Sequence, residues 1–429
     1  MALTFFYLLI GLMIIGVPIV FALIFAPIVG VWLDDKTVFL SMMPQRIFGG
    51  INQFPLLAIP MFILAGEVMN RGGITLRLVN FAKTLVGHFR GGLAHVNIVS
   101  SLMFAGLSGS AVADTSALGS MLIPAMEKDG YTRRFAAAVT AASSVIGPVI
   151  PPSIIMVVYA YIMGVSVGGL FAAGFVPGAM MGFGLMAVTA FISHKRQYPR
   201  AAVRAPIQEI RSNFISAFFP LMTPVIILGG ILSGVFTPTE AAAAAVAYAV
   251  ILSIFITRTL PLKEIPEMLY RAGLTSASIL LVIGAATVFG WVTSLSGVPA
   301  VVTSLLTSIS DNPVIVLLCV NVLLFIVGMF FDAGPAILIL GPLLAPTMIS
   351  LGIEPLHFAI IMCVNLTVGL ATPPMGLVLF VASSIGKVSI VDITKELWPF
   401  LLVHALIILL ITYVPALTLT LPRLLGLGV

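Results

Sequence analysis

The sequence predicts an all-α polytopic membrane protein with inverted repeats, two re-entrant hairpins and two broken helices. Three observations predict this fold: an apolar composition, a duplicated motif, and opposite charge around the two copies. Of the 429 residues, 60% are hydrophobic and 8% are charged, and the mean hydropathy is +1.21. A soluble domain carries roughly 25% charged residues, whereas here apolar stretches long enough to cross ~30 Å of hydrocarbon recur from end to end. A soluble fold is therefore excluded.

The duplicated motif combines a carboxylate with a Gly-x-x-x-Pro-Pro sequence. The first copy contains Asp114 and Gly147–Pro152, and the second contains Asp332 and Gly369–Pro374. Asp332 follows Asp114 by 218 positions, and the second Pro-Pro pair follows the first by 222. Such repeats inside apolar sequence are typical of membrane transporters built from two halves.

The first repeat is expected at residues 1–193. Spans are expected at residues 5–33 and 55–69, followed by an amphipathic interfacial helix at residues 75–89. After the later break, a further span at residues 170–192 ends this half.

The first hairpin is expected at about residues 91–127. Its two arms, residues 92–107 and 111–126, each hold about 16 residues and are too short for a full crossing at ~1.5 Å per residue. A helix broken at Pro151-Pro152 follows at about residues 135–163. Basic residues flank both outer ends of the hairpin, which predicts that it opens to the cytoplasm; they are Lys83, Arg90, Lys128, Arg133 and Arg134.

A basic linker at residues 194–212 joins the repeats and is expected in the cytoplasm. The second repeat is expected at residues 213–429, with its hairpin at about residues 313–350 and its broken helix at about residues 356–386. Its remaining spans are expected at residues 214–233, 241–256, 275–295 and 398–417.

The charges around the second hairpin have the opposite sign. Asp311 precedes it, Glu354 follows it, and no Lys or Arg lies between Arg271 and Lys387. This hairpin is therefore expected to open on the non-cytoplasmic side, which makes the two repeats inverted.

The Pro-Pro breaks predict cation sites. Each proline removes an N–H donor and frees carbonyl groups in the preceding turn. Those carbonyls, together with Ser144, Thr372 and the hairpin tips, form an all-oxygen environment that hard cations prefer. One site per repeat predicts two sodium ions, while the facing helix N-termini favour an anionic substrate.

Two roles fit each of the two intramembrane carboxylates. An unpaired charge at mid-bilayer costs about 3 kcal/mol or more, so each carboxylate needs a partner or a role. Asp114 and Asp332 either cap the second arm of their hairpin or serve the site. Asp332 is favoured for function because Gly334-Pro335 loosens the turn after it, and Asp114 is the closer of the two to a cap.

Several separated motifs resemble a known family. They are Gly16–Ala22, Ile59–Glu67, Gly106–Ala111 and Phe236–Ala241, and they resemble the large membrane subunit of tripartite ATP-independent periplasmic (TRAP) transporters over essentially the whole chain. The resemblance implies an elevator-type transporter, multi-pass in the bacterial inner membrane. It also implies sodium-driven import of an organic acid anion such as sialic acid or a C4-dicarboxylate, delivered by a periplasmic binding protein. A small membrane subunit of about four helices is expected as a separate chain.

The resemblance also implies the site residues. The first sodium site is expected at Ser108, Ser110, Ser144, Gly147 and Ile150, and the second at Gly328, Gly369, Thr372 and Met375. Ile150 and Met375 are expected to contribute only main-chain carbonyls. Ser110, Ser153 and Asp332 are expected to line the substrate cavity.

Three other functions fit parts of the sequence. A stand-alone sodium/dicarboxylate or citrate symporter shares the hairpins and breaks. An intramembrane aspartyl protease would use Asp114 and Asp332 as a dyad, but the Gly-x-Gly-Asp sequence typical of presenilin-type enzymes is absent at Asp332. A passive channel would conduct without saturating. We expect no enzymatic activity and no nucleic-acid partner.

Overall fold

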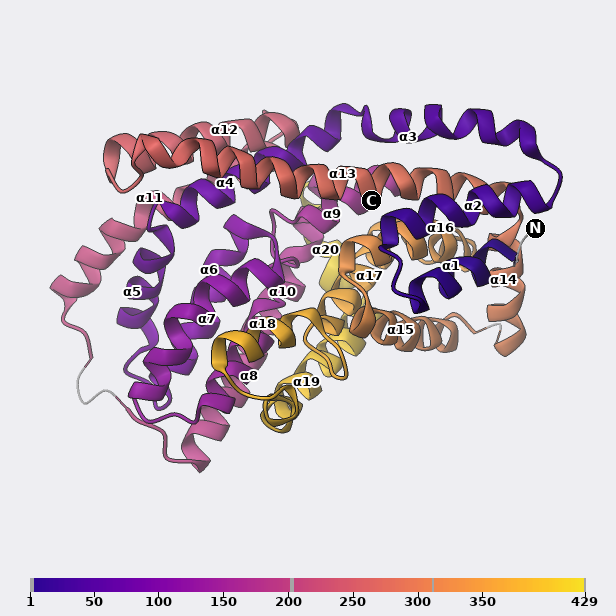
Figure 1. Ribbon diagram of the computed structural model, residues 1–429. Coiled ribbons are helices and arrows are strands. Elements are labelled where there is room, and N and C mark those ends of the chain that lie inside the picture. The colour runs from indigo at the N-terminus through magenta and orange to yellow at the C-terminus, as the bar shows by residue number, and fades with distance from the viewer. Residues whose placement is uncertain (1–3, 201–203, 311, 428–429) are drawn as a thin grey trace.

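The computed structural model describes residues 4–200, 204–310 and 312–427, and these residues form helices joined by short turns (Figure 1). Eight helical segments in this part of the chain are long and apolar enough to cross a membrane. The all-α polytopic prediction is therefore confirmed. Asp311, the acidic residue that precedes the second expected hairpin, lies outside the described residues.

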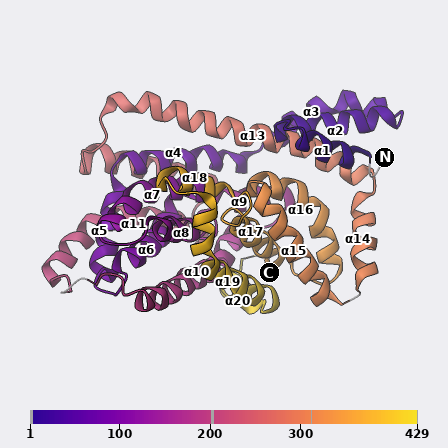
Figure 2. The same cartoon turned by 60° about the horizontal axis from the view of Figure 1, so that its bottom comes forward.

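One layer of helices forms a framework around α13 (Ile265–Leu295). Along its length α13 packs against α2 (Ile19–Leu33), α3 (Met43–Ile51) and α4 (Ala58–Arg71), and α4 packs in turn against α12 (Pro238–Ile251). The same layer includes α11 (Ile207–Leu232), which packs against α12. Figures 1 and 2 show α13 and α3 along one side of the molecule in both views.

The remaining long elements form a second group, the hairpin body. Its two hairpins are α6 (Gly92–Ser108) with α7 (Ala111–Lys128), and α15 (Pro313–Phe330) with α16 (Ala333–Ser350). The two broken helices, α8 (Arg133–Ser144) with α9 (Ile154–Met163) and α17 (Pro355–Gly369) with α18 (Leu377–Gly386), pack against them. The helices α10 (Val167–Lys195) and α19 (Ile390–Tyr413) follow the two breaks and pack against each other. Hairpins and breaks thus occur where the motif places them.

Buried amide side chains join each hairpin to its broken helix. The Asn97 Nδ2 of α6 donates to the Thr140 hydroxyl of α8 at 2.7 Å, and the Asn365 Nδ2 of α17 donates to Asn321 Oδ1 of α15 at 2.7 Å. Asn321 follows Asn97 by 224 positions, and Asn365 follows Thr140 by 225. In each half, therefore, an asparagine side chain forms a hydrogen bond with another polar side chain inside apolar surroundings, and the two bonds lie at equivalent places in the two halves.

The single span expected at residues 5–33 is wrong. The structure has two helices there, α1 (Thr4–Ile14) and α2, which fold back and pack side by side. Gly16 takes a positive φ of 89° at the turn, which favours glycine, and Pro18, which has no N–H to donate, precedes α2. The chain therefore reverses in a segment whose composition alone resembles one span.

Other elements differ from the expectation in extent. The expected interfacial helix is α5 (Ile74–Val86), and it packs between α6 and α11. Three helices were not expected: α3, α14 (Val298–Ile309) and α20 (Ala416–Leu424). The remaining elements are short helical turns: η1 (Thr37–Met42), η2 (Phe54–Leu57), η3 (Leu252–Ile256) and η4 (Leu262–Glu264).

An ion-pair cluster around one buried carboxylate joins the two halves of the chain at their basic end. The Glu396 side chain at the start of α19 is 6% exposed, and it binds Arg134 Nε of α8 at 3.0 Å and Arg196 Nη1 after α10 at 2.6 Å. The Arg196 guanidinium also lies 5.6 Å from the centre of the Phe135 ring. One carboxylate thus connects three helices of the hairpin body.

We expect Glu396→Gln to lower the thermal unfolding temperature. The change leaves two arginines facing a neutral side chain, with an expected cost of about 1–3 kcal/mol. The measurement is thermal unfolding in detergent, with Glu127→Gln as control because the Glu127 side chain, which pairs with Arg133, is 46% exposed and its pair is expected to contribute about 0–1 kcal/mol. Equal unfolding temperatures for the two variants would contradict the role assigned to Glu396.

Candidate functional site

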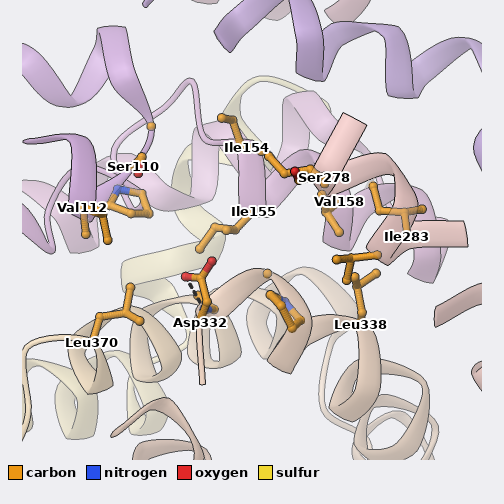
Figure 3. Close-up of a pocket in the computed structure, with 18 residues that line it drawn as sticks. Ser110, Val112, Ile154, Ile155, Val158, Ser278, Ile283, Asp332, Leu338 and Leu370 are labelled. Atoms are coloured by element: carbon orange, nitrogen blue, oxygen red, sulfur yellow. Dashed lines mark hydrogen bonds between the residues drawn. The ribbon is translucent and has the colours of Figure 1, made fainter. Parts of the chain in front are cut away.

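The two hairpin tips and the two breaks meet around one cavity of about 390 Å³. Its walls come from the α6–α7 tip, the start of α9, the middle of α13, the α15–α16 tip and the second break (Figure 3). Most of the lining is aliphatic, including Ile155, Val158 and Leu338. Such a cavity, apolar with a few polar groups, is typical of a small-molecule site.

Asp332 is the one charged residue among the described residues that line this cavity. Its Oδ1 accepts a hydrogen bond from the Ala333 N–H at 2.9 Å, at the N-terminus of α16. Figure 3 shows the carboxylate pointing between Ile155 and Leu370 into the cavity. The side chain therefore both caps α16 and faces the site, so the two readings of Asp332 are compatible.

The expected cavity serines occupy different positions. Ser110 lines the cavity and also caps α7, because its Oγ accepts from the Ala113 N–H at 3.4 Å. Ser153 does not line it: its hydroxyl is buried, donates to the Pro148 carbonyl at 2.5 Å and accepts from the Met156 N–H at the start of α9. Ser278 of α13 lines the cavity although the sequence analysis did not select it. No sequence signal marks it, since its position depends on how α13 packs.

At the first break, expected cation-site residues gather around Asp114. The Ser108 hydroxyl donates to Asp114 Oδ1, whereas Oδ2 is buried without a hydrogen-bond partner in the described residues. Asp114 Oδ2 lies so close to Gly147 that any side chain there would collide with it. The Ser144 and Thr115 hydroxyls are 2.7 Å apart nearby. Ser108, Ser144 and Gly147 are thus brought together around a carboxylate.

Two details of this first site bear on the expectation. Ser110 holds the N-cap position of α7, so Asp114, the fourth residue of the helix, makes no capping hydrogen bond there. Asp114 still lies in the first turn, where a negative charge is favoured by the helix dipole. The Ile150 side chain packs against Gly178 of α10, and a role for its main-chain carbonyl stays a prediction.

At the second break, the expected residues meet through their backbones. A Cβ on Gly328 would lie 2.8 Å from the Leu366 carbonyl and 3.0 Å from Gly369 Cα, so α15 and α17 touch at glycines. The Gly376 N–H donates to the Met329 carbonyl at 2.9 Å, which ties the break to the hairpin tip. The Thr372 hydroxyl donates to the Val368 carbonyl at 2.9 Å. Carbonyl and hydroxyl oxygens surround this second position, where Met375 is half exposed.

The two break positions offer oxygen donors only. Within residues 4–200, 204–310 and 312–427, no three His, Cys, Asp or Glu side chains gather as they would for a transition metal. Oxygen donors without nitrogen or sulfur suit a hard cation. The residues present therefore fit sodium or a similar ion.

Comparisons with known proteins agree with this architecture. The family described as "Tripartite ATP-independent periplasmic transporter, DctM component" matches residues 6–417. The chain is 41% identical to the sialic acid TRAP transporter large permease protein SiaM of Vibrio cholerae, with 97% of this chain and 98% of that one covered. It is 38% identical to the C4-dicarboxylate TRAP transporter large permease protein DctM of Rhodobacter capsulatus, with 99% of each chain covered.

A longer relative and a solved structure extend the comparison. The isethionate TRAP transporter permease protein DctMQ of Oleidesulfovibrio alaskensis is 38% identical over 94% of this chain, which covers 64% of that protein. The solved structure of MtrF from Neisseria gonorrhoeae matches with a TM-score of 0.62 at 13% identity, covering 89% of this chain and 85% of that one. At that identity the match shows the fold alone.

The family match along almost the whole chain confirms the resemblance first seen in the motifs. Together with the apolar helices, it identifies the chain as a multi-pass protein of the bacterial inner membrane that belongs to the DctM, or large permease, family of TRAP transporters.

Proposed function

We propose that this protein imports an organic acid anion, driven by sodium ions, with the anion delivered by a periplasmic binding protein. The observation that carries the proposal is the meeting of two hairpin tips and two broken helices at one cavity. The relatives named above handle sialic acid, a C4-dicarboxylate and isethionate, all of which are organic anions. A sialic acid or a C4-dicarboxylate is the substrate class we propose here.

Three helix N-termini support an anionic substrate. The helices α7, α9 and α16 begin at Ala111, Ile154 and Ala333, and all three residues line the cavity. Helix N-termini carry a partial positive charge and N–H groups without intrahelical partners, both of which favour a carboxylate. Asp332 then serves as a hydrogen-bond acceptor for substrate hydroxyl or amide groups.

Sodium is proposed as the driving ion, with one ion at each break. At the first, the candidate ligands are Ser108, Ser110, Ser144, Gly147 and the Ile150 carbonyl, and we add Asp114 because its Oδ2 is buried without a partner. A cation there offsets the cost of burying the carboxylate. At the second, the candidates are Gly328, Gly369, Thr372 and Met375. Both ions would bind where a break contacts a hairpin tip, so each would stabilise one wall of the cavity.

An elevator mechanism fits the division into framework and hairpin body. The cavity lies where α13 of the framework meets the hairpin tips, so a shift of the body along α13 would expose the cavity to one face and then the other. A separate small membrane subunit is the proposed additional partner. The DctMQ relative is longer than this chain, which is consistent with a fused second part in that protein.

Reconstitution tests the whole proposal. Uptake of labelled sialic acid or succinate into proteoliposomes holding this chain and the small subunit should require a sodium gradient and the binding protein. Equal uptake with potassium in place of sodium would refute the sodium assignment. Full uptake by this chain alone, without the binding protein, would favour the stand-alone symporter instead.

Substitutions at Asp332 separate the site role from capping. Asp332→Ala should abolish uptake, and Asp332→Asn should also lower it by at least roughly 10-fold, the equivalent of one charge-assisted hydrogen bond. Asparagine is a good N-cap, so the unfolding temperature of Asp332→Asn should stay near that of the wild type. Full uptake by Asp332→Asn would leave Asp332 with the capping role only.

Glycines at the breaks test the ion sites. Gly147→Ala would push against Asp114, and Gly369→Ala would push against the Gly328 backbone. Both changes should raise the sodium concentration that gives half-maximal uptake, by roughly 10-fold. Gly273→Ala in α13 is the control because no atom lies within 4 Å of its added Cβ. An unchanged sodium dependence in both break variants would contradict the assignment.

A further inference from the structure

A second hollow of about 540 Å³ lies beside the central cavity. Its polar lining comes from Gln45 and Arg46 of α3, Gln53 before η2, Tyr161 of α9 and Thr287 of α13. The framework thus supplies four of these side chains and the broken helix α9 supplies the fifth. None of them belongs to the candidate ion sites or to the central cavity.

The hollow and the cavity share two walls. Val158 and Ile283 line the cavity, while Tyr161 and Thr287 line the hollow three and four residues further along the same helices. Residues at these spacings lie on one face of a helix, about one turn apart. The α13 helix begins next to the basic residues Lys263 and Arg258, which places its start at the cytoplasm. The hollow is therefore displaced from the cavity toward the outer face.

Arg46 is held in place without a carboxylate partner. Its guanidinium lies 5.0 Å from the centre of the Trp291 ring, and Phe39 packs edge-on against the same ring at 5.5 Å. In the described part of the chain, no acidic side chain lies within ion-pair distance of Arg46. An arginine stacked on an aromatic ring keeps its five N–H donors in a fixed plane, where they match a carboxylate in a bidentate way.

One hydrogen bond in the hollow connects the hairpin body to the framework, and a second lies within the framework. The Tyr161 hydroxyl donates to the Gly50 carbonyl at 3.1 Å, and Gln53 Nε2 donates to the Gly49 carbonyl at 2.9 Å. Any side chain on Gly50 would collide with Thr287, so α3 and α13 touch at this point. Gln53 uses one amide hydrogen for this bond and has a second, which leaves it a donor for a ligand.

We propose that Arg46 and Gln53, in the hollow that Tyr161 closes, form an anion-binding subsite that takes the carboxylate of the substrate between the outer face and the central cavity. This inference rests on the proposed import of an organic anion. The one charged residue lining the central cavity is the negative Asp332, so the full positive charge that attracts an anion comes from outside that cavity. Arg46 supplies it one helical turn away, on the side from which the substrate arrives.

Tryptophan fluorescence tests the subsite without uptake or a sodium gradient. The chain has three tryptophans, so Trp32→Phe with Trp398→Phe leaves Trp291 as its reporter beneath Arg46, and any tryptophan of the small subunit is changed to phenylalanine as well. We expect sialic acid or succinate, titrated into the purified complex with the small subunit, to change this fluorescence saturably, whereas chloride does not. Arg46→Gln should remove the response and Arg46→Lys should weaken it. Arg423→Gln should preserve it, because Arg423 is exposed on another helix.

Uptake provides the second readout. Arg46→Gln should raise the KM for the anion by at least roughly 10-fold, with sodium activation unchanged and Arg423→Gln resembling the wild type. The subsite would be overturned if Arg46→Gln kept the KM of the wild type and the anion caused no fluorescence change in the protein that retains Arg46. An Arg46→Gln defect that excess binding protein fully restores would also overturn it, by showing a protein contact in place of an anion site. Absence of sodium-driven uptake in the wild type would instead reject the proposed function, because the titration needs neither sodium nor uptake.

Discussion

Every helix end at membrane depth must find hydrogen-bond partners inside the protein, and the rest of this structure depends on that constraint. Hydrocarbon offers no donors or acceptors, yet two hairpin tips and two breaks place helix ends around one mostly apolar cavity inside the protein. The chain satisfies them against one another: the Gly376 N–H reaches the Met329 carbonyl, and Ser110 caps α7. Tips and breaks are consequently neighbours, and the space between them becomes the cavity.

The two halves satisfy this constraint with different chemistry. At the first break a buried carboxylate, Asp114, stands among hydroxyl groups, whereas at the second break two glycine backbones meet among carbonyls. A carboxylate attracts a cation with a full charge, and carbonyls do so with dipoles. The duplicated motif thus encodes two breaks whose polar surroundings are unequal.

The sequence predicts what local chemistry determines. Proline pairs must interrupt helices, so both breaks were predictable close to the observed helix ends. Arm length predicts only the first hairpin, because α15 and α16 of the second are each long and apolar enough to cross a membrane. The fold-back of α1 on α2 was not predictable from the sequence, because a glycine and a proline spaced like Gly16 and Pro18 also occur in single helices that are only kinked. The burial of Ser153, the cavity position of Ser278 and the stacking of Arg46 on Trp291 depend on contacts between distant segments. No spacing along the chain encodes those contacts.

The Glu396 cluster has a consequence for the order in which the protein is completed during synthesis. Arg134 and Arg196 leave the ribosome long before Glu396, which follows Arg196 by 200 positions. At about 5–20 residues per second, Arg196 waits roughly 10–40 s for the shared carboxylate and Arg134 waits longer. These two arginines therefore lack their acidic partner while the first half is made, and they gain it only when the start of the last long helix is synthesised.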